Sequence, residues 1–324
     1  MTIVKNNKIV INANNLTKSF GEIIAVNNIS FEIHEGEIVG ILGPNGAGKT
    51  TTLRLLTGVF KLEGNAKVEI YGLDLSKNLT KCKSKFGIVP EVSNAYSDYT
   101  VEQNLIFSGR IYGLSKEVIQ ARSEELLKRF ELTGKRKSRT KTLSKGLKQR
   151  LNLCLALLHD PPILILDEPT SGLDPFSVKI LRDQILKLKR ENKTILMSTH
   201  DMIEAQTICD RILIMNRGKI IADEHPDTLR KDFNPSLTIS FKIEGEISKD
   251  LMNEMQNYFT YIKIQEDDSF KITTQDVLED LHRLYNFVRQ RNLEVLDMKL
   301  KETSLEEVFI NLVKSDLNGE VTKK

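Results

Sequence analysis

A glycine-rich run lies between a strand-like stretch and a helix-like one and is suited to binding phosphate. The run GPNGAGKT matches the pattern G-x-x-x-x-G-K-[ST]. It follows the apolar EIVGIL and opens the helical KTTTLRLL, which is the context that this kind of loop requires. Glycines let successive backbone N–H groups point inward at phosphate oxygens, and the helix start adds its positive dipole end. The predicted loop comprises Gly43, Pro44, Asn45, Gly46, Ala47, Gly48, Lys49 and Thr50.

Three side chains at the end of this loop have predicted contacts with a bound triphosphate. Lys49 reaches the β- and γ-phosphates, and the Thr50 hydroxyl is placed to ligate Mg²⁺. Thr51 adds a hydroxyl for the α-phosphate.

Two carboxylates follow a second apolar strand. Asp167 and Glu168 come directly after ILIL, at the carboxyl end of the strand, where open α/β sheets bind their ligands. Asp167 is suited to hold Mg²⁺ through water, and Glu168 to orient and deprotonate a water that attacks the γ-phosphate. Alone, the pair could be an ordinary polar strand end; the upstream phosphate loop favours the catalytic interpretation.

The elements that must position these residues alternate in type. Strand-like stretches such as KIVINANNL, ISFEIHEG and EIVGIL come first, and residues 100–159 have helical spacing. Short apolar strands then return in PILILDEP, TILMST and RILIMNRGKII, separated by a helical stretch. This alternation predicts an α/β domain with a largely parallel sheet covered on its faces.

The pattern changes near Arg230 to strand, helix, strand, strand, helix, strand and a terminal helix. That order is the split arrangement of ferredoxin-like domains. We therefore expect a nucleotide-binding domain over 1–230, with a helical subdomain at about 92–160, and a small α+β domain over 231–324. The two central strands should meet at Glu266–Asp268, and the polar tail SDLNGEVTKK should be frayed.

Composition excludes several classes of protein. The 324 residues are 40% hydrophobic and 28% charged with a net charge of +3, as in an ordinary globular protein. Cys82, Cys154 and Cys209 are widely spaced, which suggests neither a disulfide framework nor a zinc site and fits a reduced cytosolic compartment. No signal-peptide core is present, and no run reaches the roughly 18 apolar residues needed to cross a bilayer.

The motifs together resemble the nucleotide-binding subunit of an ABC transporter. GPNGAGKTT, a divergent LSKGL, LILDEPTSGLDP and STHD occur in that family's order and at its separations, over about residues 9–230. The resemblance implies an ABC-type fold with a mixed sheet and a helical subdomain, and ATP and Mg²⁺ as cofactors. It also implies that a second copy, or a related cassette, pairs head to tail so that each ATP is clamped between the phosphate loop of one and the signature of the other.

The resemblance assigns roles to further residues. Phe20 matches the aromatic that stacks on adenine, although it could be a core Phe at a strand end. His200 matches the residue that contacts the γ-phosphate and keeps Glu168 and the water aligned. Asp174 matches the loop that communicates between two ATP sites, or it could simply cap a helix ahead of Pro175.

The signature departs from the usual Leu-Ser-Gly-Gly-Gln. Lys145 and Leu147 replace a Gly and the Gln, whereas Ser144 and Gly146 remain. Ser144 can cap the following helix, and its hydroxyl with the Gly146 N–H can meet the γ-phosphate held by the other subunit. We expect a competent variant.

Glu91 stands where the family usually has a Gln that contacts the metal, so the resemblance implies that Glu91 still binds Mg²⁺ with altered electrostatics. In the family this region also senses the membrane subunit. Tyr96 and Tyr99 could line the groove that receives it, or could be ordinary surface aromatics. Glu91, Lys145 and the terminal SLEEVF at 304–309 are together similar to the branch of exporters whose cassette and permease are separate chains.

A basic run could bind nucleic acid or lipid headgroups, but it lacks interleaved aromatics and is better explained as a solvated rim, so no nucleic-acid partner is expected. Its members are Lys135, Arg136, Lys137, Arg139, Lys141, Lys145, Lys148 and Arg150.

The expected function is therefore ATP hydrolysis that drives a separately encoded, multi-spanning permease, most simply an exporter, from the cytoplasmic face of the membrane. A soluble ABC ATPase for iron–sulphur assembly or nucleic-acid work is one alternative. A regulator without turnover is another, opposed by the presence of Lys49, Asp167, Glu168 and His200.

Overall fold

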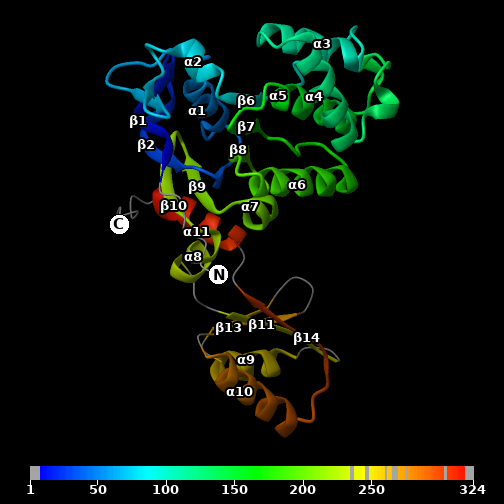
Figure 1. Ribbon diagram of the computed structural model, residues 1–324. Coiled ribbons are helices and arrows are strands. Elements are labelled where there is room, and N and C mark those ends of the chain that lie inside the picture. The colour runs from blue at the N-terminus through cyan, green and yellow to red at the C-terminus, as the bar shows by residue number, and fades with distance from the viewer. Residues whose placement is uncertain are drawn as a thin grey trace. The chain divides into compact units, whose positions relative to one another are not determined.

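The computed structural model describes residues 8–233, 237–244, 248–259, 261–264, 269–274, 276–302 and 305–317. The chain divides into two compact units between Pro226 and Asp227, close to the boundary predicted near Arg230 (Figure 1). Among the described residues, no helix has both the length and the apolar character needed to cross a membrane.

The first unit is built on a six-stranded sheet in the order β10-β9-β3-β8-β7-β6, parallel except for β10. Every residue of β3, β7 and β8 is buried, as expected for parallel strands covered on both faces. Their carboxyl ends meet at one sheet edge, which brings the ends of distant sequence segments together. The strands are β3 (Ile38–Leu42), β6 (Phe86–Val89), β7 (Ile163–Asp167), β8 (Thr194–Thr199), β9 (Arg211–Asn216) and β10 (Lys219–Glu224).

An antiparallel sheet in the order β2-β1-β4-β5 accompanies the first one. One apolar core, including Ile11 of β1, Leu53 of α1 and Ile163 of β7, joins both sheets and the helix α1. The phosphate loop therefore lies on a rigid support. The elements are β1 (Ile9–Phe20), β2 (Ile23–His34), α1 (Lys49–Leu56), β4 (Lys67–Ile70), β5 (Leu73–Asp74) and α2 (Leu79–Lys83).

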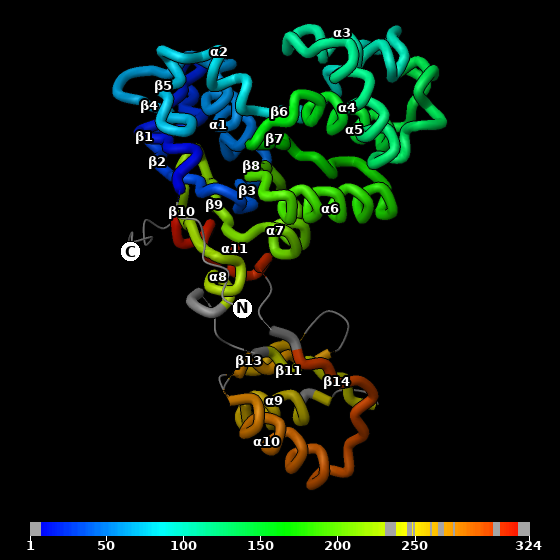
Figure 2. The backbone as a smooth tube through the Cα atoms, in the orientation of Figure 1, coloured from blue at the N-terminus to red at the C-terminus, as the bar shows by residue number. Residues whose placement is uncertain are grey.

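Three helices make up most of the predicted helical subdomain, and they lie together beyond β6, away from β1 and β2 (Figure 2). They are α3 (Val101–Ile111), α4 (Lys116–Arg129) and α5 (Lys145–Leu157), with short 3₁₀ turns at Thr133–Lys135 and Thr140–Thr142. Thr100, Ser115 and Ser144 begin them, each accepting a backbone N–H with its side-chain oxygen. The remaining helices of the first unit are α6 (Pro175–Arg190) and α7 (Met202–Ile208).

The second unit contains a four-stranded antiparallel sheet in the order β12-β13-β11-β14. Its element order follows the prediction, and α9 and α10 cover one face over a core rich in phenylalanine (Figure 1). Assignment to the ferredoxin-like class stays a prediction. The turn at Glu266–Asp268 and the end of the tail lie outside the described residues. After α8 (Pro226–Phe233), the elements are β11 (Leu237–Ile243), α9 (Lys249–Tyr258), β12 (Ile262–Ile264), β13 (Phe270–Thr274), α10 (Val277–Gln290), β14 (Val295–Glu302) and α11 (Leu305–Leu317).

Candidate functional site

The phosphate loop runs from the end of β3 into α1, and its backbone requires glycine at defined positions. Gly46 and Gly48 have φ of 82° and 104°, a region that other residues rarely adopt. A Cβ at Gly43 would lie 2.3 Å from the Met215 carbonyl oxygen, and one at Gly48 would lie 2.2 Å from that of Ala25. Pro44, Asn45 and Gly46 are exposed, Ala47 is buried and Thr51 is half-buried on α1.

The Lys49 ammonium lies inside the curve of this loop. Its Nζ donates to the carbonyl oxygens of Gly43 at 2.8 Å and Pro44 at 3.2 Å. It also forms an ion pair with Glu168 Oε1 at 3.1 Å, and only 6% of its side chain is exposed. The predicted triphosphate lysine and the predicted base therefore share one site.

A hydroxyl and a carboxylate face each other beside Lys49. Thr50 Oγ1 donates to Asp167 Oδ1 at 3.0 Å. Ser198, which the sequence did not single out, donates to the same Asp167 oxygen at 2.6 Å. Ser198 Oγ also accepts the backbone N–H of Glu168 at 3.0 Å, so one side chain fixes both carboxylate residues. The signal for Ser198 in the sequence was weak, because a small polar residue near the end of a parallel strand is common.

Glu168 lies between a cation and an imidazole. Its Oε2 is 2.5 Å from His200 Nδ1, while its other oxygen pairs with Lys49. The residue has a φ of 47°, so the chain turns sharply directly after β7. His200 remains 54% exposed and can therefore meet a ligand as well as Glu168.

A partly buried network holds the chain on both sides of His200. Thr199 Oγ1 donates to Glu204 Oε2 at 2.7 Å and accepts the Asp201 backbone N–H at 3.0 Å. Asp201 Oδ1 accepts the Glu204 N–H at 2.9 Å, and its Oδ2 accepts from Arg182 of α6 at 2.9 Å. Glu204 is fully buried, and burial is the main cause that raises its pKa. Sequence reasoning missed this network because its members do not form a motif.

Phe20 ends β1 with 46% of its surface exposed, so the alternative of a core Phe is wrong. Its ring packs edge-on against Phe60 at 5.5 Å, and the Lys18 ammonium lies 5.5 Å from its centroid. The exposed ring is free to receive a planar base.

The signature region and the loop after β7 pack against each other. Ser144 Oγ accepts the Leu147 N–H at 3.3 Å and caps α5. A Cβ at Gly146 would lie 2.7 Å from Ser177 Oγ, so α5 and α6 begin in close approach. Asp174 caps α6 by accepting from the backbone and hydroxyl of Ser177 at 2.9 and 2.6 Å, and this hydrogen bonding lowers the pKa of Asp174. Among the described residues, the hydrogen bonds of Ser144 do not include the phosphate loop.

Glu91 is exposed after β6, whose end lies beside that of β7. Within the described part of the chain it has no hydrogen bond to Thr50 or Asp167, so its predicted metal role remains a proposal. The rings of Tyr96 and Tyr99 lie 5.3 Å apart, tilted by 31°, and pack edge-on against Phe107 at 4.9 and 6.1 Å. Of their surfaces, 51% and 42% are exposed.

The basic run is partly neutralised. Arg136 pairs with Glu102 at 2.6 Å, Lys141 with Asp98 at 2.8 Å and Arg150 with Glu131 at 2.7 Å. These acidic partners neutralise three of the cations, so the run offers less positive charge to a nucleic acid.

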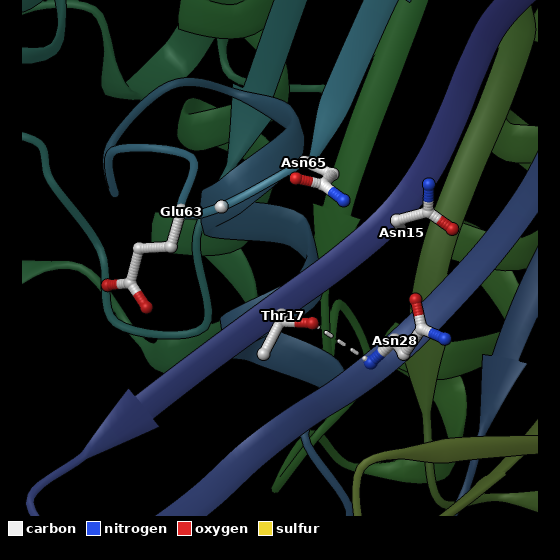
Figure 3. Close-up of a pocket in the computed structure, with 6 residues that line it drawn as sticks. Asn15, Thr17, Asn28, Glu63 and Asn65 are labelled. Atoms are coloured by element: carbon white, nitrogen blue, oxygen red, sulfur yellow. Dashed lines mark hydrogen bonds between the residues drawn. The ribbon is translucent and has the colours of Figure 1, made fainter.

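A separate open pocket of about 480 Å³ lies over β1 and β2 and contains none of the predicted residues. Across it, Thr17 Oγ1 accepts the backbone N–H of Asn28 at 3.1 Å (Figure 3). Asn15, Glu63, Gly64 and Asn65 complete its lining.

Known proteins share these features. The sequence model of the ABC transporter family matches residues 26–171. An uncharacterized ABC transporter ATP-binding protein of Methanocaldococcus jannaschii is 42% identical over 211 residues, which are 65% of this chain and 76% of that protein. The Nod factor export ATP-binding protein I of Rhizobium sp. is 32% identical over 305 residues, 94% of this chain and 97% of that protein.

Solved structures agree. The ATP-binding subunit of an ABC transporter is 30% identical with a TM-score of 0.64, covering 69% of this chain and 93% of its own. A dimeric bacterial ABC transporter cassette is 31% identical with a TM-score of 0.61, covering 66% of this chain and 98% of its own. Together with the phosphate loop and the Lys49–Glu168–His200 arrangement, these similarities confirm the resemblance: the chain belongs to the ABC transporter ATP-binding proteins, the ATPases that hydrolyse ATP to power transport.

Proposed function

We propose that two copies of this cassette, or one copy and a related cassette, close on ATP and drive a separately encoded exporter permease. The observation that carries the proposal is the arrangement of Glu168, with Lys49 on one carboxylate oxygen and His200 on the other. A base held between a phosphate-binding cation and an imidazole suits attack of water on a γ-phosphate.

In this proposal each side chain has one task. The phosphate loop amides and Lys49 hold the β- and γ-phosphates, and the exposed ring of Phe20 stacks on adenine. Glu168 orients the water and accepts its proton, while His200 keeps Glu168 aligned with the γ-phosphate. Phosphoryl transfer depends mainly on such positioning and electrostatic stabilisation.

The residues beside Lys49 fit Mg²⁺. A threonine hydroxyl and an aspartate carboxylate 3.0 Å apart are oxygen donors of the kind that this hard cation prefers. Thr50 and Asp167 would hold it together with the phosphates, and Glu91 would add a carboxylate from the adjacent strand end. Bound there, Mg²⁺ would neutralise negative charge on the phosphate oxygens.

The signature supports a head-to-tail pair. Within the described residues of one chain, Ser144 and Gly146 contact the starts of α5 and α6 and not the phosphate loop. A second copy would therefore supply its Ser144 and Gly146 to the γ-phosphate, and Asp174 beside them would sense the partner's site. One of the similar structures is a dimeric cassette, which supports the pairing of two cassettes.

The exporter assignment rests on relatives and on one surface. Several relatives are named as Nod factor export ATP-binding proteins, one of which matches 94% of this chain. The exposed aromatic group of Tyr96 and Tyr99 follows Glu91 and would receive the permease, holding the cassette at the inner face of the membrane.

Co-purification tests this function. A tagged full-length chain should recover a multi-spanning protein from detergent-solubilised membranes, and a Tyr96→Ala, Tyr99→Ala double variant should lose that protein while retaining ATP hydrolysis. A control variant in the second unit, Tyr285→Ala, removes an exposed tyrosine as well and should retain the membrane protein. Recovery of ribosomes or an assembly scaffold in place of a membrane protein would contradict the proposal and favour a soluble ABC ATPase.

A further inference from the structure

The strand β14 leaves a long edge of the second unit's sheet open. It has 8 residues, whereas β12 at the opposite edge has 3. β11 pairs along one side of β14, and no strand among the described residues pairs along the other. Such an edge presents unpaired N–H and C=O groups to another strand, and proteins usually keep exposed edges short or interrupted. The ladder with β11 is regular from 297 to 302, because its register shift lies between Lys242 and Ile243.

The same strand carries apolar side chains that the helices do not cover. Met298 and Leu300 are 47% and 50% exposed, although they pair with Phe241 and Ile239, which are 2% and 0% exposed. Leu296 is 60% exposed. Within the part of the chain that the structure describes, the apolar face beneath α9 and α10 therefore continues onto the edge strand β14, where these side chains stay exposed.

The sequence of this edge is complementary to itself. In Leu296-Asp297-Met298-Lys299-Leu300, an antiparallel copy centred on Met298 places Asp297 opposite the partner's Lys299. It also places Leu296 opposite the partner's Leu300. Asp297 and Lys299 are 53% and 63% exposed and pair with each other at 2.6 Å within the strand, so an antiparallel copy would exchange these two contacts for two between the strands.

Neighbouring registers lack this match. A shift of the pairing by two residues places Lys299 opposite the partner's Lys299, or Asp297 opposite the partner's Asp297, and like charges in such positions destabilise a strand pair. A shift by one residue places Met298 opposite a charged side chain. Lysine on an edge strand usually prevents pairing. Lys299 is already paired with Asp297 of its own strand, and of these registers only the one centred on Met298 keeps an aspartate opposite it.

We propose that β14 is a dimerisation edge, at which a second copy of this chain adds its own β14 antiparallel about Met298 and joins the two four-stranded sheets. The pairing uses main-chain hydrogen bonds along the edge, two Asp297–Lys299 contacts and the uncovered apolar residues. It needs no nucleotide and is therefore distinct from closure of the cassettes on ATP.

A cysteine cross-link tests the register in the full-length chain without nucleotide. Cys82, Cys154 and Cys209 are buried, so they offer little background reaction. Met298→Cys should give an interchain disulfide on mild oxidation, because opposite residues of an antiparallel pair lie about 4.5–5.5 Å apart at Cβ. Leu278→Cys, on α10 and 80% exposed, is the control and should not exceed background. Equal cross-linking of both variants would overturn the proposal.

Charge reversal tests the same contact without oxidation. Asp297→Lys should raise the dissociation constant of the nucleotide-free dimer about tenfold or more, measured by sedimentation. The double variant Asp297→Lys, Lys299→Asp should restore it, because the two residues face each other across the dimer. The proposal would be refuted if the parent chain were monomeric, or if the dissociation constant did not change after the single reversal. It would also be refuted if the double variant kept a native circular dichroism spectrum but did not restore the dimer. None of these outcomes bears on the proposal that Glu168 catalyses ATP hydrolysis, which is assayed separately.

Discussion

Glu168 Oε2 and His200 Nδ1 lie 2.5 Å apart although 32 residues separate them in the chain. The contact exists because β7 and β8 are parallel neighbours whose carboxyl ends coincide, so the residues directly after each strand meet. The sheet thus sets the geometry of the proposed hydrolytic site.

Glu168→Gln should retain ATP and stabilise the ATP-bound dimer while turnover falls by about 10²-fold or more, because the amide orients water but cannot accept its proton. Phosphate release and gel filtration with ATP measure the two effects. Glu117→Gln, on the exposed side of α4, is the control and should behave like the parent. A Glu168→Gln protein with parental turnover would show that another group is the base.

Gly43→Ala should weaken ATP binding and lower the free energy of unfolding by about 1–3 kcal/mol, as overpacking does. The new Cβ would lie 2.3 Å from the Met215 carbonyl oxygen, so the loop or β9 must move. Gly134→Ala has no atom within 4 Å of the new Cβ and should change neither quantity. Chemical denaturation and nucleotide titration of the two variants measure these differences.

Phe20→Ala should weaken ATP binding by about 1–3 kcal/mol, the usual contribution of an aromatic that stacks on a base. Phe20→Tyr should bind ATP like the parent, since its ring also stacks. Fluorescent-nucleotide titration gives both values. Equal affinity for the parent and Phe20→Ala would place the adenine elsewhere.

Ser144→Arg should abolish hydrolysis while monomeric ATP affinity stays unchanged, because the hydroxyl is proposed to act on the partner's nucleotide. The substitution also removes a helix cap, which costs about 1 kcal/mol. Ser115→Arg removes the equivalent cap of α4 and should keep hydrolysis, which separates the two effects. Full activity of Ser144→Arg would exclude the signature from the site.

The stability contributed by Glu204 should depend on pH. Burial raises its pKa, and hydrogen bonds from Thr199 and Thr170 offset this only in part. The parent chain should therefore lose stability as the pH rises from the ordinary value of 4.5 through the higher pKa of the folded state. Glu204→Gln removes this titration. Urea denaturation should therefore show that the variant's free energy of unfolding rises relative to that of the parent over this pH interval. Parallel pH profiles would contradict the assignment.

The sequence was informative where function depends on adjacent residues. The phosphate loop and the Asp167–Glu168 pair are short local runs, and their strand and helix flanks were correctly predicted. Residues such as Ser198 and Glu204 act through contacts with distant segments, and a single sequence contains no local pattern for such contacts.

The long hairpin of β1 and β2 was underestimated for a related reason. Asn15 and Asn28 resemble turn residues, and the predicted strands ended or began beside them. Both adopt positive φ, of 52° and 49°, within the strands, and the ladder continues past them through irregular register. Both residues keep the local conformation that asparagine tolerates, and strand pairing resumes beyond them across irregularities in the ladder.

Ser198 couples two residues of the proposed active site. Its single hydroxyl donates to Asp167 and accepts from the backbone of Glu168, so the proposed metal ligand and the proposed base share one support on β8. We therefore expect a displacement of β8 to move both residues together, so that a substitution at Ser198 changes cation affinity and catalytic rate at the same time.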